Sequence, residues 1–265
     1  MQNIKIFLTV FFSLMLAGAG LAAAQTSSYS EEQSRQILQQ IDSMVSYPEN
    51  DFSAEYTITQ ERPGQGSSRT RAALFRRDSR DAYAIILLDP EVDRGKGYLK
   101  IGNSLHVYDP VARRFTVTSA RDRFQNSNAR NSDFTRSTLA QDYRITGAEQ
   151  QTLGAYQTIV YDLEAITDEV SYPKMRIWVD QNNLVRKVED YSLSGQLMRT
   201  TAIPSYQQIE NLYVPITIVM IDALHGREIE GVFRNDRTVI SVAKPSFQNV
   251  PDVVFTRSYL ERVSQ

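Results

Sequence analysis

Residues 212–221 read Leu-Tyr-Val-Pro-Ile-Thr-Ile-Val-Met-Ile, and they indicate the class of fold. Alternate positions from Leu212 to Met220 are apolar, which is the period of a β-strand with one buried face. Val219 and Ile221, which point to the opposite face, are apolar as well. A strand that is apolar on both faces belongs to a sheet covered on both sides. A curved sheet with a helix against its concave face fits this pattern.

Further strands are predicted on both sides of this stretch. Period-two segments recur along the chain, and Asn, Asp, Gly and Pro residues separate them as tight turns do. We predict strands at residues 52–59, 69–77, 82–88, 98–101, 105–108, 114–118, 143–150, 156–166, 174–180, 184–191, 196–203, 212–221, 227–233 and 238–242. His225-Gly226 and Asn235-Asp236 are predicted turns. Since no repeat or linker interrupts the series, residues 25–265 are expected to form a single domain, a sandwich or a barrel.

One amphipathic helix precedes the strands. Ser30-Glu31-Glu32-Gln33 has the form of a capping box, with Ser at the N-cap and Gln three residues later. Apolar residues follow at helical spacing, at Ile37, Leu38, Ile41, Met44 and Val45. Tyr47-Pro48 ends the helix, because proline disfavours helical backbone at the residue before it. This helix has one narrow apolar face to bury against something larger.

Two shorter helices are also expected. Ser132-Asp133 is suited to cap a helix that runs through residues 138–140. Residues 251–263 have the pattern of a short closing helix, with Thr256 as its N-cap.

The first 24 residues have the pattern of a cleaved secretory signal. Lys5 is the cation of the n-region, residues 6–16 form an apolar run, and Ala22-Ala23-Ala24 offers a small-residue cleavage site. The run is about 11 residues long, against the ~20 that a spanning helix needs. We predict a signal peptide over residues 1–24 and a mature chain that begins at Gln25 and works outside the cytoplasm. A retained N-terminal anchor is the alternative.

Composition narrows the classes of partner. The formal net charge of −2 argues against nucleic acid or an anionic membrane surface as the main partner. The chain has no Cys, so an exported protein of this sequence depends on its core rather than on disulfides. No segment of the mature chain is apolar enough to predict a transmembrane helix.

Catalytic and metal-binding patterns are missing from the sequence. His106 and His225 fall on different predicted elements without the spacing of metal ligands. The alternating carboxylates Asp89, Glu91 and Asp93 lack the Gly and the distal Glu of a calcium loop. We therefore predict no enzymatic activity, no catalytic residues, no metal and no cofactor. A hydrolase with dispersed carboxylates stays open as an alternative, since such pairs have no fixed local spacing.

An apolar cavity is the remaining candidate site. A curved sheet with a helix over its open side can enclose a small apolar ligand. The candidate ligand-binding residues are Ile37, Ile41, Met44, Phe52, Tyr56, Ile58, Leu74, Phe75, Ile85, Leu87, Trp178, Val214, Ile216, Ile218 and Met220. The alternative is that these residues form an ordinary dry core.

Several stretches, taken in order, resemble the outer-membrane lipoprotein-sorting proteins, the LolA-like family. The resemblance is carried by Gly97-Tyr98-Leu99-Lys100 with Val107-Tyr108-Asp109-Pro110, by Asn131-Ser132-Asp133-Phe134 with Leu139 and Asp142-Tyr143, by Arg176-Ile-Trp178-Val-Asp180 with residues 184–189, and by Phe255-Thr256 with Tyr259-Leu260. It covers nearly the whole mature chain. The broader LolA-like proteins that accompany transport systems are more similar to it than the housekeeping carrier is.

The resemblance implies an α+β fold that is mainly antiparallel β, an unclosed half β-barrel. An N-terminal helix and short helices would cover its concave apolar face. It also implies a periplasmic carrier or chaperone that binds acyl chains of lipoproteins or other lipids and moves them towards the outer membrane. An inner-membrane transporter or permease complex would supply the cargo. The alternative function is a non-enzymatic lipid-sensing or accessory module of an envelope transport complex.

The resemblance also implies a latch for the lid. In the housekeeping carrier, an arginine on an early strand holds the lid through hydrogen bonds. Leu74-Phe75-Arg76-Arg77 occupies the matching place, which makes Arg77 or Arg76 the candidate latch, although Asp78 replaces the flanking proline. An Arg77→Leu variant is expected to load cargo but to release it differently. A solvated strand end is the alternative for both arginines.

Overall fold

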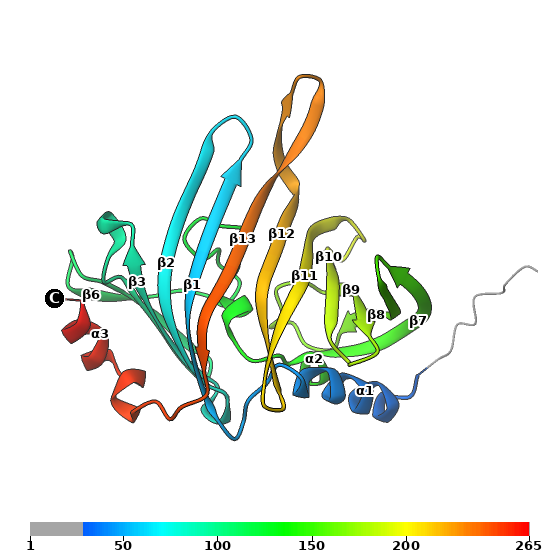
Figure 1. Cartoon of the computed structure of the whole chain (residues 1–265), viewed down its shortest axis with the longest axis horizontal. Coiled ribbons are helices and arrows are strands. Elements are labelled where there is room, and N and C mark those ends of the chain that lie inside the picture. Colours follow the sequence, from blue (N-terminus) through cyan, green and yellow to red (C-terminus); the bar gives the residue numbers. More distant parts are fainter. Residues whose placement is uncertain (1–28, 265) are drawn as a thin grey trace, which may run out of the picture.

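The computed structural model describes residues 29–264, which form one strongly curved antiparallel sheet with helices at its sides (Figure 1). The predicted signal peptide, residues 1–24, lies outside the described residues. The helices are α1 (Glu31–Ser43), α2 (Leu139–Asp142) and α3 (Arg257–Val263), with 3-10 turns at Asp78–Arg80, Glu91–Asp93, Asn131–Phe134 and Asp252–Phe255. The strands are β1 (Asp51–Arg62), β2 (Gly66–Arg77), β3 (Ala82–Asp89), β4 (Gly97–Ile101), β5 (Ser104–Asp109), β6 (Arg114–Val117), β7 (Tyr143–Leu153), β8 (Tyr156–Ala165), β9 (Lys174–Asp180), β10 (Val185–Tyr191), β11 (Leu197–Ile209), β12 (Leu212–Ile229) and β13 (Val232–Ser246).

The sheet does not close into a complete barrel. Its strand order is β6-β5-β4-β3-β2-β1-β13-β12-β11-β10-β9-β8-β7, so β6 and β7 are its two edges within residues 29–264. Every pairing between neighbouring strands is antiparallel. The predicted fold class, a mainly antiparallel unclosed barrel with an N-terminal helix, is confirmed.

The expected helix caps are present. The Ser30 hydroxyl accepts a hydrogen bond from the Gln33 amide, and the Gln33 side chain accepts one from the Ser30 amide. Leu38 and Ile41 of α1 are buried against β7, β8 and β9. The predicted helix after Ser132 is instead two short pieces, because Asn131–Phe134 forms a 3-10 turn and α2 begins only at Leu139.

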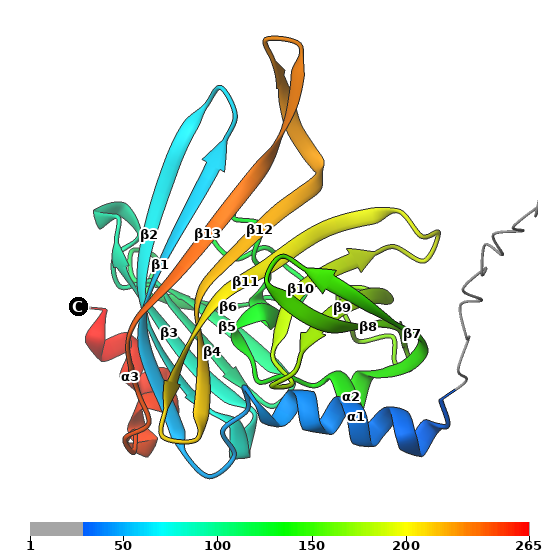
Figure 2. The same ribbon diagram turned by 45° about the vertical axis from the view of Figure 1, so that its right-hand side comes forward.

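The sheet has an inner, concave face and an outer face. Alternate residues of β3 are buried on each of them. Ile85 and Leu87 point to the inner core, whereas Ala84 and Ile86 pack on the outer side with Leu260 of α3. Helix α3 therefore covers the outer face and not the concave one. Figures 1 and 2 show α1 and α2 beside β7 to β11, and α3 on the far side of the sheet near β3.

The last hairpin differs from the predicted one. The expected turns at His225-Gly226 and Asn235-Asp236 are wrong, since both dipeptides lie within β12 and β13 and the turn falls at Glu230 and Gly231. Gly226 faces Asn235 across the hairpin, and a Cβ there would lie 2.3 Å from the Arg234 carbonyl oxygen. The glycine therefore permits a close approach of two strands rather than a reversal of the chain.

None of the helices within residues 29–264 combines the length and the apolar character needed to cross a membrane.

Candidate functional site

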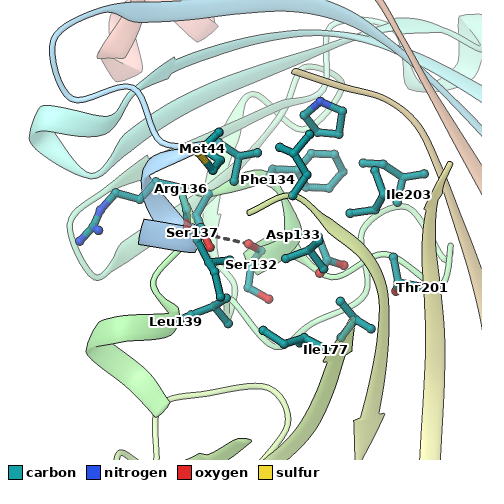
Figure 3. Close-up of a pocket in the computed structure, with 18 of the residues that line it drawn as sticks. Met44, Ser132, Asp133, Phe134, Arg136, Ser137, Leu139, Ile177, Thr201 and Ile203 are labelled. Carbon is teal, nitrogen blue, oxygen red and sulfur yellow. Dashed lines mark hydrogen bonds between the residues drawn. The ribbon is translucent and has the colours of Figure 1, made fainter. Parts of the chain in front are cut away.

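A cavity of about 270 Å³ lies between the inner face of the sheet and the chain that covers it (Figure 3). Most of its wall is apolar: Ile41, Met44, Val45, Tyr47, Phe52, Tyr56, Phe134, Leu139, Met175, Ile177, Leu184, Val185, Val188, Ile203, Tyr206, Pro215, Ile218, Met220 and Ile240. An apolar cavity of about 150 Å³ already holds benzene. This space can therefore hold a longer apolar group.

Two chain segments, residues 41–47 and 131–139, close the cavity on the side away from the sheet; we call them the cover. Asp42 joins them, because its carboxylate accepts hydrogen bonds from the amides of Leu139 at 3.0 Å and Ala140 at 2.9 Å, and from the Ser137 hydroxyl at 2.5 Å. Burial raises the pKa of Asp42 above its usual value, although these hydrogen bonds oppose the shift. The cover is thus held together by a buried ionisable group.

Arg76 connects the sheet to both parts of the cover. Its guanidinium donates to the carbonyl of Val45 at 2.9 Å and to that of Thr135 at 3.3 Å. Asp78 balances the charge, with a carboxylate oxygen 2.7 Å from Arg76 Nε. The guanidinium also lies 4.8 Å from the centre of the Tyr47 ring, within cation–π distance. Arg76 itself lines the cavity.

Arg77 points to the outer face, away from the cavity. Its Nε and Nη2 atoms donate to the two oxygens of Asp51 at 2.8 and 2.7 Å, and its guanidinium also contacts the Val250 carbonyl and Asp252. The hydrogen bonds from Arg77 hold the pKa of Asp51 below its usual value. The side chain also lies over the ring of Phe255, at 4.7 Å. Arg77 thus fastens the C-terminal segment to the sheet.

One part of the cavity wall is polar, and we call Asp190, Arg199 and Thr201 the polar wall. Arg199 Nε donates to Asp190 Oδ2 at 2.8 Å, and Arg199 Nη1 donates to Asp133 Oδ2 at 2.6 Å. One guanidinium is therefore shared by two carboxylates. Burial raises the pKa of Asp190, and the like charge of Asp133 adds to this shift, although Arg199 opposes it.

The other half of the inner face is occupied by residues 118–130, which we call the filling segment. Phe124 is completely buried there, 4.7 Å from the Tyr98 ring centre and 4.6 Å from that of Phe134. The backbone amide of Asn128 donates to the Thr238 hydroxyl at 2.9 Å, and this bond anchors the segment to β13. The result is a packed apolar core over β1 to β5.

The predicted ligand-binding residues divide into three groups. Those that line the cavity are Ile41, Met44, Phe52, Tyr56, Ile218 and Met220. Those that lie in packed clusters are Ile37 of α1 and the inner-face residues Ile58, Leu74, Ile85, Leu87, Val214 and Ile216. Those on the outer face are Phe75, which packs near α3, and Trp178, whose ring lies 4.1 Å from Lys187 Nζ. Phe75 and Trp178 are one residue out of phase with the inward positions of their strands.

The polar wall was absent from the sequence-based candidates. A usable signal exists, since Asp190 and Arg199 oppose each other across a predicted hairpin at positions that share a face with Val188. An acid and a base facing each other at inward positions indicate a buried ion pair. Residues 132–137, which no periodicity marks, also line the cavity.

Two solved structures share this fold. A LolA superfamily protein from Nitrosomonas europaea is 24% identical, covers 85% of this chain and 98% of its own, and has a TM-score of 0.71. An outer membrane lipoprotein-sorting protein domain from Vibrio parahaemolyticus is 19% identical, covers 88% of this chain and 100% of its own, and has a TM-score of 0.75. The protein therefore has the LolA-like fold, as the resemblance predicts.

A protein family model described as "uncharacterized protein" matches residues 79–262, well over half of the chain, and the chain belongs to that family. The search of curated proteins gave no match.

Proposed function

We propose that this protein is a periplasmic carrier that binds the acyl chains of lipoproteins or other lipids in the cavity and moves them towards the outer membrane. The observation that carries the proposal is an apolar cavity closed by two segments, both of which accept hydrogen bonds from Arg76 of the sheet. The signal-like pattern of residues 1–24 supports the location. The lipoprotein-sorting name of the Vibrio structure with the same fold supports the class of cargo.

Binding of acyl chains is favoured by the removal of apolar surface from water. Each methylene that enters the cavity contributes roughly 0.8 kcal/mol. The present volume is smaller than the ~300–1,000 Å³ of typical ligand sites, so a long chain requires the cover to move outward. Movement of the cover is therefore part of the proposed loading step.

Arg76 is the latch in this proposal. Its hydrogen bonds to Val45 and Thr135 hold both parts of the cover against the sheet and must break when the cover opens. Arg77, the adjacent candidate, makes its contacts with the C-terminal segment instead.

A fluorescent fatty-acid probe tests binding. The delipidated protein should take up the probe, and Ile218→Trp should abolish most of the uptake, because Ile218 lines the cavity. Ile221→Trp is the matched control, since Ile221 lies on the opposite face of the same strand and is partly exposed. Equal loss in both variants, or no uptake by the unchanged protein, contradicts the proposal.

Release of a bound probe to acceptor vesicles tests the latch. Arg76→Leu should speed release, because each part of the cover loses its hydrogen bond from Arg76. Arg77→Leu should lower stability by about 3–5 kcal/mol, the usual cost of breaking a buried ion pair, while leaving the release rate of the folded fraction unchanged. An unchanged release rate in Arg76→Leu would remove this residue from the latch role.

Transfer to an acceptor separates the carrier from a lipid-sensing module. A carrier passes cargo to membranes bearing an acceptor faster than the cargo dissociates spontaneously. A sensor binds the probe with no such acceleration.

A further inference from the structure

The polar wall interrupts an otherwise apolar cavity at a defined place on β10 and β11. Asp190 pairs with Arg199 across the two strands, and Val188 pairs with Thr201. Asp190 and Thr201 are thus diagonal neighbours on the inner face of these two strands. All four residues line the cavity, and Figure 3 shows Thr201 next to Ile203 at its wall.

Two polar atoms of this wall have no protein partner. Within residues 29–264, Asp190 Oδ1 and Thr201 Oγ1 are buried and make no hydrogen bond. Asp190 is 0% exposed and Thr201 is 6% exposed. Buried polar atoms in native proteins are nearly always hydrogen-bonded, so two adjacent exceptions on the wall of a cavity point to a ligand group that pairs with them.

The charges around the polar wall restrict which ligand group fits. A carboxylate would face Asp190 Oδ1 as a like charge, and Arg199 is already shared between Asp190 and Asp133. An ammonium would have to lose its hydration inside a mostly apolar cavity. A hydroxyl is neutral, and it can donate to Asp190 Oδ1 while it accepts from the Thr201 hydroxyl.

We propose that the cavity selects an apolar molecule that carries a hydroxyl group, with Asp190 and Thr201 binding that hydroxyl. This inference rests on the proposed function, because it assumes that the cavity takes apolar ligands. It adds a chemical class to the cargo: a hydroxylated lipid rather than a purely hydrocarbon chain.

A matched pair of ligands tests the selectivity. 1-Dodecanol and its methyl ether share the same chain, but only the alcohol can donate a hydrogen bond. Each competes with the fluorescent fatty-acid probe for the delipidated full-length protein. We expect the alcohol to bind about tenfold more tightly, the effect of one hydrogen bond to a charged acceptor.

Three variants assign the selectivity to the polar wall. Thr201→Val should reduce the preference for the alcohol, whereas Thr200→Val, on the opposite face of β11, should leave it unchanged. Asp190→Asn keeps an oxygen for Arg199 Nε and places an amide NH₂ where Oδ1 stands. That site donates instead of accepting, so the ether should gain affinity and the preference should nearly vanish.

The failure of this inference is distinguishable from the failure of the proposed function. If both ligands displace the probe equally from the unchanged protein, the cavity binds apolar chains and the hydroxyl site is wrong. If the preference survives both Thr201→Val and Asp190→Asn, the selectivity lies elsewhere and the assignment is also wrong. If neither ligand nor the probe binds, the proposed function itself falls.

Discussion

The two halves of the sheet's inner face have similar strands but different coverings. Over β1 to β5, the filling segment inserts Phe124 between the strands and Phe134, and the space is packed. Over β9 to β12, the cover passes across the face without filling it and leaves about 270 Å³. Apolar inward residues occur in both halves, so the covering segment decides which half is core and which is a binding site.

The largest expected difference between the halves is in the cost of truncating a buried leucine. Leu87 and Leu184 are both fully buried, but only Leu184 borders the cavity. Leu87→Ala should lower the unfolding free energy by about 4–5 kcal/mol, and Leu184→Ala by about 2–3 kcal/mol, because Leu184 has fewer packing partners to lose. Denaturant unfolding measures both values. Equal losses would mean that the cavity is collapsed in solution.

Ligand binding should stabilise the protein and should protect only the half of the inner face that contains the cavity. At 100 times its Kd, a bound fatty acid should raise the unfolding free energy by about 2.7 kcal/mol. Amide hydrogen exchange should slow in residues 41–47 and 131–139, which form the cover, and stay unchanged in residues 120–129 of the filling segment. Equal protection of both segments would contradict the division of the inner face.

The contribution of Asn128, which anchors the filling segment, to the unfolding free energy should not depend on pH. The Asn128 backbone N–H donates to the Thr238 hydroxyl and to Gln60 Oε1, two groups that do not titrate in the ordinary range. The Asn128 side-chain oxygen accepts from Arg123 Nη1 at 3.1 Å. Asn128 also donates from its side chain to the Asp236 carbonyl at 3.1 Å. Asn128→Ala should cost about 1–3 kcal/mol by leaving that carbonyl unpaired, with the same loss at pH 5 and pH 8. A loss that differs between pH 5 and pH 8 would contradict this prediction.

The contribution of Asp42, which joins the two parts of the cover, to the unfolding free energy should depend on pH. We expect this to be the smallest of the effects. Burial raises the pKa of Asp42 in the folded state, so its contribution to stability is fully present below the unfolded value of 3.8 and is lost as the pH rises through the folded value. The difference in unfolding free energy between the unchanged protein and Asp42→Asn should therefore grow in favour of the unchanged protein as the pH falls from 7 to 4. A difference that shrinks over that range would reverse the assigned sign.

Much of the fold is readable from the sequence because it rests on local patterns. The capping box at Ser30, the period-two strands and the N-cap at Thr256 are local features, and all three are present in the structure. The end of the β12–β13 hairpin differs from the prediction because turn-forming residues also occur within the strands of this long exposed hairpin. His225-Gly226 follows Asp222, whose carboxylate accepts hydrogen bonds from the amides of Leu224 and His225. The register of β12 against β13 shifts between Ile221 and Gly226, but the chain does not reverse there.

The site was less predictable because strand periodicity shows which residues face inward but not what covers them. Leu87 and Ile218 have equivalent patterns, yet one is in the packed core and the other lines the cavity. The filling segment and residues 131–138 are polar and aperiodic, so their place inside the sheet follows from long-range contacts such as that of Arg199 with Asp133. Trp178 is one residue out of phase with Ile177 and Val179, which face inward, so it lies on the outer face of β9.

Photo-crosslinking with a fatty acid that carries a diazirine near its methyl end tests most directly whether the half with the cavity binds acyl chains. Mass spectrometry should find the crosslinked peptides in residues 41–47, 175–190 and 199–220, which line the cavity. Crosslinks confined to residues 72–87 and 105–130, or to the outer face around Phe75, would contradict the assignment of the binding site to this half of the sheet.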